Sequence, residues 1–205
     1  MDVEGKKERV FAILFCAGVE TPRRRGVVKS LAWTGGLVTC GVAPTTDVPG
    51  VRLVGSIEIQ GPGGWGPRAL KACIDILPAG ESDLLLIHRD DQGPIRPELV
   101  DRLAELVRGG ADLALPLLDA PGPLKWTSGA GKAGGSWVDV VLTLDASAVA
   151  VAAWPMLTTA GRLRRDLAAV GRDATAGMDP AALVERGGGV VRGLWIGGRG
   201  EGADS

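Results

Sequence analysis

Short apolar runs alternate with helical patterns along most of the chain. The runs at 10–15, 83–88 and 111–118 are almost uninterrupted, which is typical of strands buried on both faces of a parallel sheet. Between the last two runs, apolar residues recur at helical spacing over 95–108, with Pro97 in the first turn. This strand–helix–strand order predicts a parallel sheet with right-handed crossovers.

Weaker patterns complete the prediction. The remaining expected strands are 37–42, 51–59, 137–144 and 190–196, and the remaining expected helices are 68–77, 147–153, 159–170 and one that starts at Asp179–Pro180. Residues 16–29 are predicted to be a loop with no crossover helix after it. We therefore expect one α/β domain over 1–205: a mainly parallel twisted sheet with helices on both faces, a projecting β-arm at 123–141 and a flexible tail at 197–205.

Composition narrows the function classes. The length of 205 residues suits one domain, and the formal net charge of −1 gives no bulk reason to expect a nucleic-acid or membrane partner. Three Cys without a CxxC spacing, together with a single His, argue against a disulfide framework and against a zinc or histidine-rich metal site. No long apolar run follows the first ten residues, which predicts a cytoplasmic protein without a signal peptide.

Four segments, taken in order, resemble the methylerythritol phosphate cytidylyltransferases. Residues 10–29 resemble that family's strand and its Ala-Ala-Gly-x-Gly-x-Arg…Pro-Lys loop, with the spacing from Gly18 to Lys29 retained. Gly63 and the helix that follows resemble its Gly-Gly turn. Residues 84–106 resemble its Val-Leu-Val-His-Asp-Ala-Ala-Arg-Pro strand end and the next helix, and residues from Thr143 onward resemble its Thr-Val-Asp-Arg…Thr-Pro-Gln segment.

The resemblance implies a Rossmann-like nucleotidyltransferase fold and a set of site residues. The family joins a sugar-alcohol phosphate to CTP and releases pyrophosphate, a reaction that depends on positioning and on neutralising charge. It implies nucleotide binding at Ala17, Gly18, Arg23 and Gly63, a catalytic Lys29, a substrate-binding Lys125, and Mg²⁺ at Asp90 if the protein is active.

Plainer interpretations stay open for several of these residues. The three arginines at 23–25 form either a phosphate clamp or an exposed basic run. Asp90 and Asp91 either hold a metal at a strand end or simply begin a polar loop. Lys125 either approaches a substrate phosphate or lies in a turn, and His88 is expected to be a structural residue at a strand end.

The chain departs from the family pattern at cationic positions. The loop Arg aligns with Pro22, the second loop Gly with Glu20, the Pro before the lysine with Val28, and the Arg after Thr-Val-Asp with Ala146. The late Asn-x-Lys-Val-Thr segment has no match beyond Gly198. Since the transition state concentrates negative charge, we predict that transfer of CMP is lost or altered.

Two other functions fit the same residues. One is an active cytidylyltransferase of the non-mevalonate isoprenoid pathway, which makes CDP-methylerythritol and pyrophosphate with cations from other positions. The other is a different nucleotidyltransferase, such as a guanylyltransferase of molybdenum-cofactor synthesis or a sugar-phosphate type. We also expect a homodimer paired through the arm at 123–141, against the alternative of a loop on a monomer.

Overall fold

The computed structural model describes residues 8–17, 21–41, 48–58, 66–122, 124–127, 140–170 and 178–196. The chain divides into two compact units. The first comprises Met1–Leu115 and Trp154–Arg192, and the second comprises Pro116–Ala153 and Gly193–Ser205. Within the described part of the chain, no helix combines the length and the apolar character needed to cross a bilayer.

A mixed, mainly parallel sheet organises the fold. Its strands are β1 (Val10–Cys16), β2 (Leu37–Gly41), β3 (Leu53–Ile57), β4 (Leu84–Arg89), β5 (Leu113–Asp119), β8 (Ala150–Ala152), β9 (Met156–Thr159) and β10 (Val191–Trp195). The order is β10-β5-β9-β4-β1-β2-β3, with β8 pairing with β5. Strands β3, β2, β1 and β4 are parallel neighbours, whereas β9 runs antiparallel to both β4 and β5.

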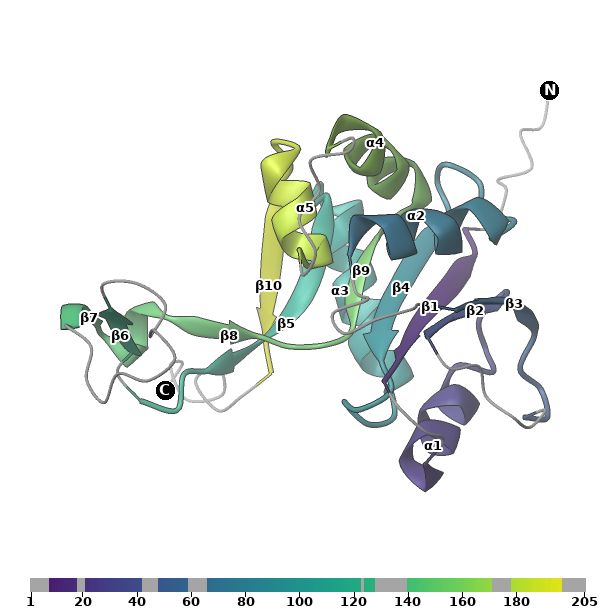
Figure 1. The fold of residues 1–205 in the computed structure, drawn as a ribbon, viewed down its shortest axis with the longest axis horizontal. Coiled ribbons are helices and arrows are strands. Elements are labelled where there is room, and N and C mark those ends of the chain that lie inside the picture. The colour runs from purple at the N-terminus through teal and green to yellow at the C-terminus, as the bar shows by residue number, and fades with distance from the viewer. Residues whose placement is uncertain are drawn as a thin grey trace. The chain divides into compact units, whose positions relative to one another are not determined.

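Helices cover both faces of the sheet in the first unit (Figure 1). They are α1 (Pro22–Ser30), α2 (Pro67–Ile76), α3 (Pro97–Arg108), α4 (Ala160–Val170) and α5 (Pro180–Arg186). Helix α4 contacts both α2 and α5, while α3 packs against β9 from behind the sheet in the view of Figure 1. The predicted fold class is thus confirmed.

The two central strands carry the core and position the site. Every side chain of β1 from Phe11 to Cys16, and of β4 from Leu84 to His88, is buried. Burying one large aliphatic or aromatic side chain is worth about 1.5–3 kcal/mol, so this pair of strands forms a rigid centre. Because β1 and β4 are parallel and in register up to Phe15 and Arg89, the residues that follow each strand emerge side by side.

Residues 22–29 do not form the predicted loop. They belong to α1, whose start is set by Thr21: its Oγ1 accepts a hydrogen bond from the Arg24 backbone N at 3.1 Å, and Pro22 occupies the first turn. This helix connects β1 to β2, so the crossover helix expected to be missing is present.

Two further expectations are wrong in detail. The predicted helix over 147–153 is instead a 3₁₀ turn, Ala146–Ala148, followed by β8, because pairing with β5 gives this Ala-rich segment strand partners. Strand β9 was not expected before the helix at 159–170. Helices α2, α3, α4 and α5 lie close to their predicted ranges.

The arm is a two-stranded antiparallel ribbon where the structure describes it. Strands β6 (Leu124–Thr127) and β7 (Val140–Leu144) pair with each other in a sheet of their own within the second unit. The residues between them, and the tail at 197–205, lie outside the described residues.

Candidate functional site

The carboxyl ends of β1 and β4 bring the first predicted site residues together. Asp90 follows β4, and its backbone N donates to the Phe15 carbonyl of β1 at 3.0 Å. Ala17 follows β1, and its backbone N donates to Asp90 Oδ1 at 3.2 Å. In open α/β sheets this carboxyl edge is where ligands bind.

A buried ion pair joins this edge to α1. Arg24 Nε donates to Asp90 Oδ2 at 2.6 Å, and Arg24 Nη2 donates to the Ala17 carbonyl at 3.0 Å. The Arg24 side chain is 1% exposed and that of Asp90 is 6% exposed. Both backbone polar groups of Ala17 are therefore held, one by each partner of the pair.

Arg24 contacts the residues on both sides of the connection between β1 and α1. Ala17 is held on the β1 side, and Thr21 is held on the α1 side through its cap on the Arg24 backbone. A charged, fully hydrogen-bonded pair of this kind is stable only when all its partners are in place, because each ion alone would be costly to bury.

The outer face of α1 lines an open hollow of about 480 Å³. Its lining includes Thr21, Pro22, Arg25, Gly26 and Lys29. These residues recur at helical spacing, so they share one face of α1, whereas Arg24 points to the opposite, buried side. Two basic residues, Arg25 and Lys29, thus line the same space.

The segment after Asp90 packs on α1. The backbone N of Ile95 donates to Ser30 Oγ at 3.0 Å, and Pro94 lies beside Gly26. Gly93 has a φ of +87°, a conformation that favours glycine, and the Arg23 guanidinium lies next to it. Helix α1 is therefore braced by the β4–α3 connection as well as by the ion pair.

His88 is enclosed at the end of β4. Its Nε2 is 2.9 Å from the Gly93 carbonyl oxygen, while its buried Nδ1 has no hydrogen-bond partner. Burial lowers the pKa of His88 below its usual 6.5, although the bond to Gly93 and the nearby Asp91 and Asp90 oppose the shift. The imidazole is accordingly neutral at pH 7 and supports the loop structurally.

The sequence-predicted site residues fall into three groups. Ala17, Arg23, Lys29 and Asp90 gather around α1 and the ends of β1 and β4. Lys125 lies on β6 in the second unit, where its Nζ donates to Thr143 Oγ1 at 2.8 Å. Gly18 and Gly63 lie outside the described residues.

Arg24 is the residue that the sequence prediction missed. In a loop the three arginines at 23–25 are equivalent, but on a helix only one of them can face the core. The signal was Arg24, Val27, Val28 and Leu31, which follow the i, i+3, i+4, i+7 spacing of a buried helix face.

The described carboxylates at this edge are a poor fit for the Mg²⁺ that the family resemblance implies. Both oxygens of Asp90 already accept hydrogen bonds, from Arg24 and from Ala17. Asp91 is held by Arg89 at 2.9 and 2.6 Å. Nowhere in the described part of the chain do three His, Cys, Asp or Glu side chains form a group that could hold a metal ion. Asp90 as a metal ligand stays a prediction, and the guanidinium beside it argues against that role.

Comparison with known proteins supports the resemblance. No protein-family model matches the chain. A 2-C-methyl-D-erythritol 4-phosphate cytidylyltransferase of Rubrobacter xylanophilus is 38% identical over 130 residues, which are 61% of this chain and 52% of that protein. The matched region thus spans about half the length of this curated relative.

Solved structures share the fold at lower identity. The 2-C-methyl-D-erythritol 4-phosphate cytidylyltransferase of Thermus thermophilus superposes with a TM-score of 0.63 at 18% identity, covering 92% of this chain and 88% of that one. The 4-diphosphocytidyl-2C-methyl-D-erythritol synthase of Anaerococcus prevotii gives 0.66 at 11% identity, covering 92% and 89%. The chain is thus similar in sequence to one 2-C-methyl-D-erythritol 4-phosphate cytidylyltransferase over part of its length, and it shares the fold of the solved structures.

Proposed function

We propose that the chain binds a nucleotide along the outer face of α1, and that it is a diverged member of this family whose CMP transfer is lost or altered. The observation that carries the proposal is the hollow of about 480 Å³, into which Arg25 and Lys29 face from the same side of the helix. Cationic side chains beside a helix that begins at a capped Thr21 suit phosphate oxygens.

The charge inventory supports the loss or change of chemistry. Of the three consecutive arginines, Arg24 is committed to Asp90 and Ala17 inside the protein, so it does not face the hollow. Ala146 stands in a 3₁₀ turn of the second unit where the family has an Arg. Removing one oriented donor from a transition state costs roughly 10²–10³ in rate, so two such losses would bring transfer below ordinary detection.

Calorimetric titration with CTP tests nucleotide binding. Lys29→Ala is expected to weaken CTP binding by about tenfold, since a hydrogen bond to a charged group is worth about 1.5–3 kcal/mol. Arg165→Ala, an exposed residue of α4, removes the same charge away from the hollow and serves as the control. Equal affinity in the wild type and Lys29→Ala would count against this placement.

A pyrophosphate-release assay with CTP and methylerythritol phosphate separates the proposal from its main alternative. We expect no release above background. Turnover on the order of 1–10³ per second would instead identify an active cytidylyltransferase of the isoprenoid pathway. Release only with another nucleotide and acceptor would favour a different nucleotidyltransferase.

We further propose that the chain forms a homodimer through the β6–β7 ribbon. Leu124 lies opposite Leu144, and Leu142 shares their face by its strand spacing, whereas Lys125 and Thr143 occupy the other face. Leu124 is 40% and Leu142 is 53% exposed, so this apolar face is available to a second copy. Light scattering should give a dimer mass at micromolar concentration for the wild type and a monomer mass for Leu142→Asp. A monomeric wild type would refute the dimer.

A further inference from the structure

Arginine and lysine side chains supply positive charge at the carboxyl edge of β1 and β4. Helix α1 carries four basic residues and no acidic one. The two carboxylates that follow β4 are both paired with guanidinium groups, Asp90 with Arg24 and Asp91 with Arg89. The Arg89 guanidinium also lies 6.0 Å from the centre of the Trp154 ring, which further fixes its place.

The Arg24 guanidinium occupies the position that a cation bound by Asp90 would need. It approaches Asp90 Oδ2 at 2.6 Å, and the second oxygen is turned to the Ala17 backbone N at 3.2 Å. A divalent ion could bind there only by displacing a buried arginine, which would then lose its bonds to both Asp90 and Ala17. The cost of burying an unpaired charge opposes that exchange.

Resting on the proposed function, we propose that this site binds a polyphosphate anion, free of any divalent cation, and that Arg24 supplies the positive charge that neutralises Asp90. The ligand class is an uncomplexed nucleoside triphosphate or pyrophosphate. Arg24 acts as a positioning residue: it holds Ala17 and the start of α1 while Lys29 and Arg25 face the phosphates.

This arrangement has a consequence for magnesium. Mg²⁺ bound to a triphosphate or a pyrophosphate cancels part of its negative charge. A site that already holds its own cations gains less from the complex than from the free anion. Added Mg²⁺ is therefore expected to leave the affinity unchanged or to weaken it, whereas a site that lacks its own cation would need the metal.

The experiment is calorimetric titration of the full-length protein with CTP and with inorganic pyrophosphate, each in EDTA and in excess Mg²⁺. We expect both to bind in EDTA, with an affinity equal to or higher than that in Mg²⁺. Binding of CTP in Mg²⁺ but not in EDTA would overturn the inference and leave the proposed function standing. Binding of pyrophosphate in EDTA without any binding of CTP would sustain the inference and remove the proposed function, and no binding of either ligand under any condition would remove both.

Two further measurements address the pair itself. Electron paramagnetic resonance of Mn²⁺ should show no binding of Mn²⁺ by the nucleotide-free wild type. Binding that disappears in Asp90→Asn would overturn the inference.

In Arg24→Gln, the affinity for pyrophosphate in EDTA should fall by about tenfold or more, and Mg²⁺ should restore part of it, because Asp90 has lost its guanidinium partner. Arg165→Gln is the charge-matched control and should show neither change. An Arg24→Gln protein that behaves like this control would overturn the role given to Arg24, and if it does not fold the Mn²⁺ measurement still decides.

Discussion

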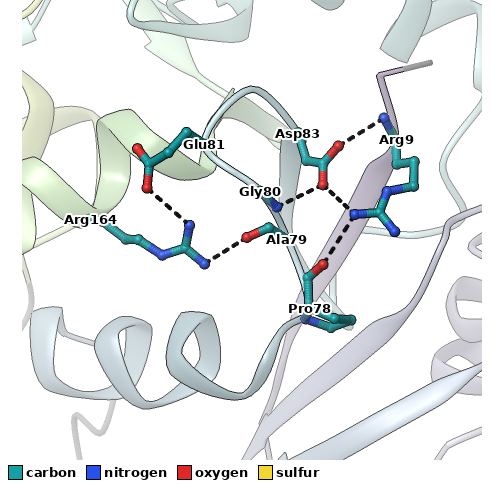
Figure 2. A network of polar contacts seen from close by, with 7 residues as sticks. All are labelled: Arg9, Pro78, Ala79, Gly80, Glu81, Asp83 and Arg164. Atoms are coloured by element: carbon teal, nitrogen blue, oxygen red, sulfur yellow. Dashed lines mark hydrogen bonds and ion pairs between the residues drawn. The ribbon is translucent and has the colours of Figure 1, made fainter. Parts of the chain in front are cut away.

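An Arg–Asp ion pair lies at each end of the neighbouring strands β1 and β4. At the amino end, Arg9 precedes β1 and Asp83 precedes β4, and their side chains meet at 2.8 Å (Figure 2). At the carboxyl end, Arg24 and Asp90 meet at 2.6 Å. The two pairs differ chiefly in burial, since the Arg9 side chain is 46% exposed and that of Arg24 is 1% exposed.

The amino-end pair belongs to a hydrogen-bond network that is partly exposed to solvent. Asp83 also accepts from the backbone N atoms of Gly80 and Arg9, and Arg9 Nη2 reaches the Pro78 carbonyl at 3.2 Å. Figure 2 shows Arg164 of α4 holding the same loop through Ala79 and Glu81. With many donors around Asp83 and a half-exposed arginine, the loss of one contact leaves others in place.

The carboxyl-end pair is shielded from solvent on both sides. Arg24 and Asp90 are both buried, so solvent cannot replace either partner. The comparison indicates that the exposure of an Arg–Asp pair, more than its identity, decides how much stability is lost when one partner is removed.

The sharpest test of this difference removes each arginine in turn. Arg24→Gln should lower the free energy of unfolding by about 3–5 kcal/mol, because it leaves a buried carboxylate unpaired. Arg9→Gln should cost about 1 kcal/mol or less, since solvent screens a half-exposed pair. Urea titrations at pH 7 measure both values.

A double variant serves as the control for this test. Arg24→Met combined with Asp90→Leu removes both charges and should recover most of the stability lost in the single variant. Equal losses in Arg24→Gln and Arg9→Gln would break the comparison.

The second test concerns Asp83 and acid. Burial raises the pKa of Asp83, but hydrogen bonds from Arg9 and Gly80 outweigh it and hold the pKa below its usual 3.8. A carboxyl with a lowered folded pKa stabilises the fold above its unfolded pKa of about 3.9, and this contribution is lost as the pH falls through the folded value.

Asp83→Asn should therefore cost about 1–3 kcal/mol at pH 7, where it leaves donors poorly matched. The difference from the wild type should shrink by pH 3. Asp75→Asn, at an exposed pair with Lys71, is the matched control and should change stability by less than about 0.5 kcal/mol. A gap between the wild type and Asp83→Asn that stays constant from pH 7 to pH 3 would contradict the assigned role.

The sequence predicted those elements whose conformation is indicated by their own hydrophobic pattern, without knowledge of the segments they pair with. Strands β1, β4 and β5 and helix α3 are nearly continuous apolar or strongly periodic segments, so their identity is local. Strand β8 was mistaken for a helix because its Ala-rich sequence has no local strand signal. Its conformation comes from pairing with β5, where Val151 lies opposite Leu118.

For the candidate site, the sequence predicted where Asp90 lies in the fold but not what it contacts. Asp90 could be placed at the carboxyl edge because it follows a buried strand. The partner of Asp90 could not be named, because that required knowing that 22–30 is a helix and which of its sides faces the core. Because residues 22–29 were predicted to be a loop, the sequence did not indicate which of the three arginines faces the core or that Arg24 pairs with Asp90.

The smallest expected effect lies between the two pairs, at the only histidine in the chain. His88 is the penultimate residue of β4, and burial holds its pKa below 6.5, so the unfolded chain takes up a proton before the folded one as the pH falls. The free energy of unfolding should fall as the pH drops from about 7 through 6.5 and level off below the folded pKa. This window is well above that of Asp83, so pH separates the two ends of the same strand. NMR of the single imidazole should give a titration midpoint below 6.5, and urea titrations from pH 7 to pH 5.5 should show the slope in the wild type but not in His88→Gln. A midpoint at or above 6.5 would mean that the imidazole is more open to solvent than its enclosure beside Gly93 indicates.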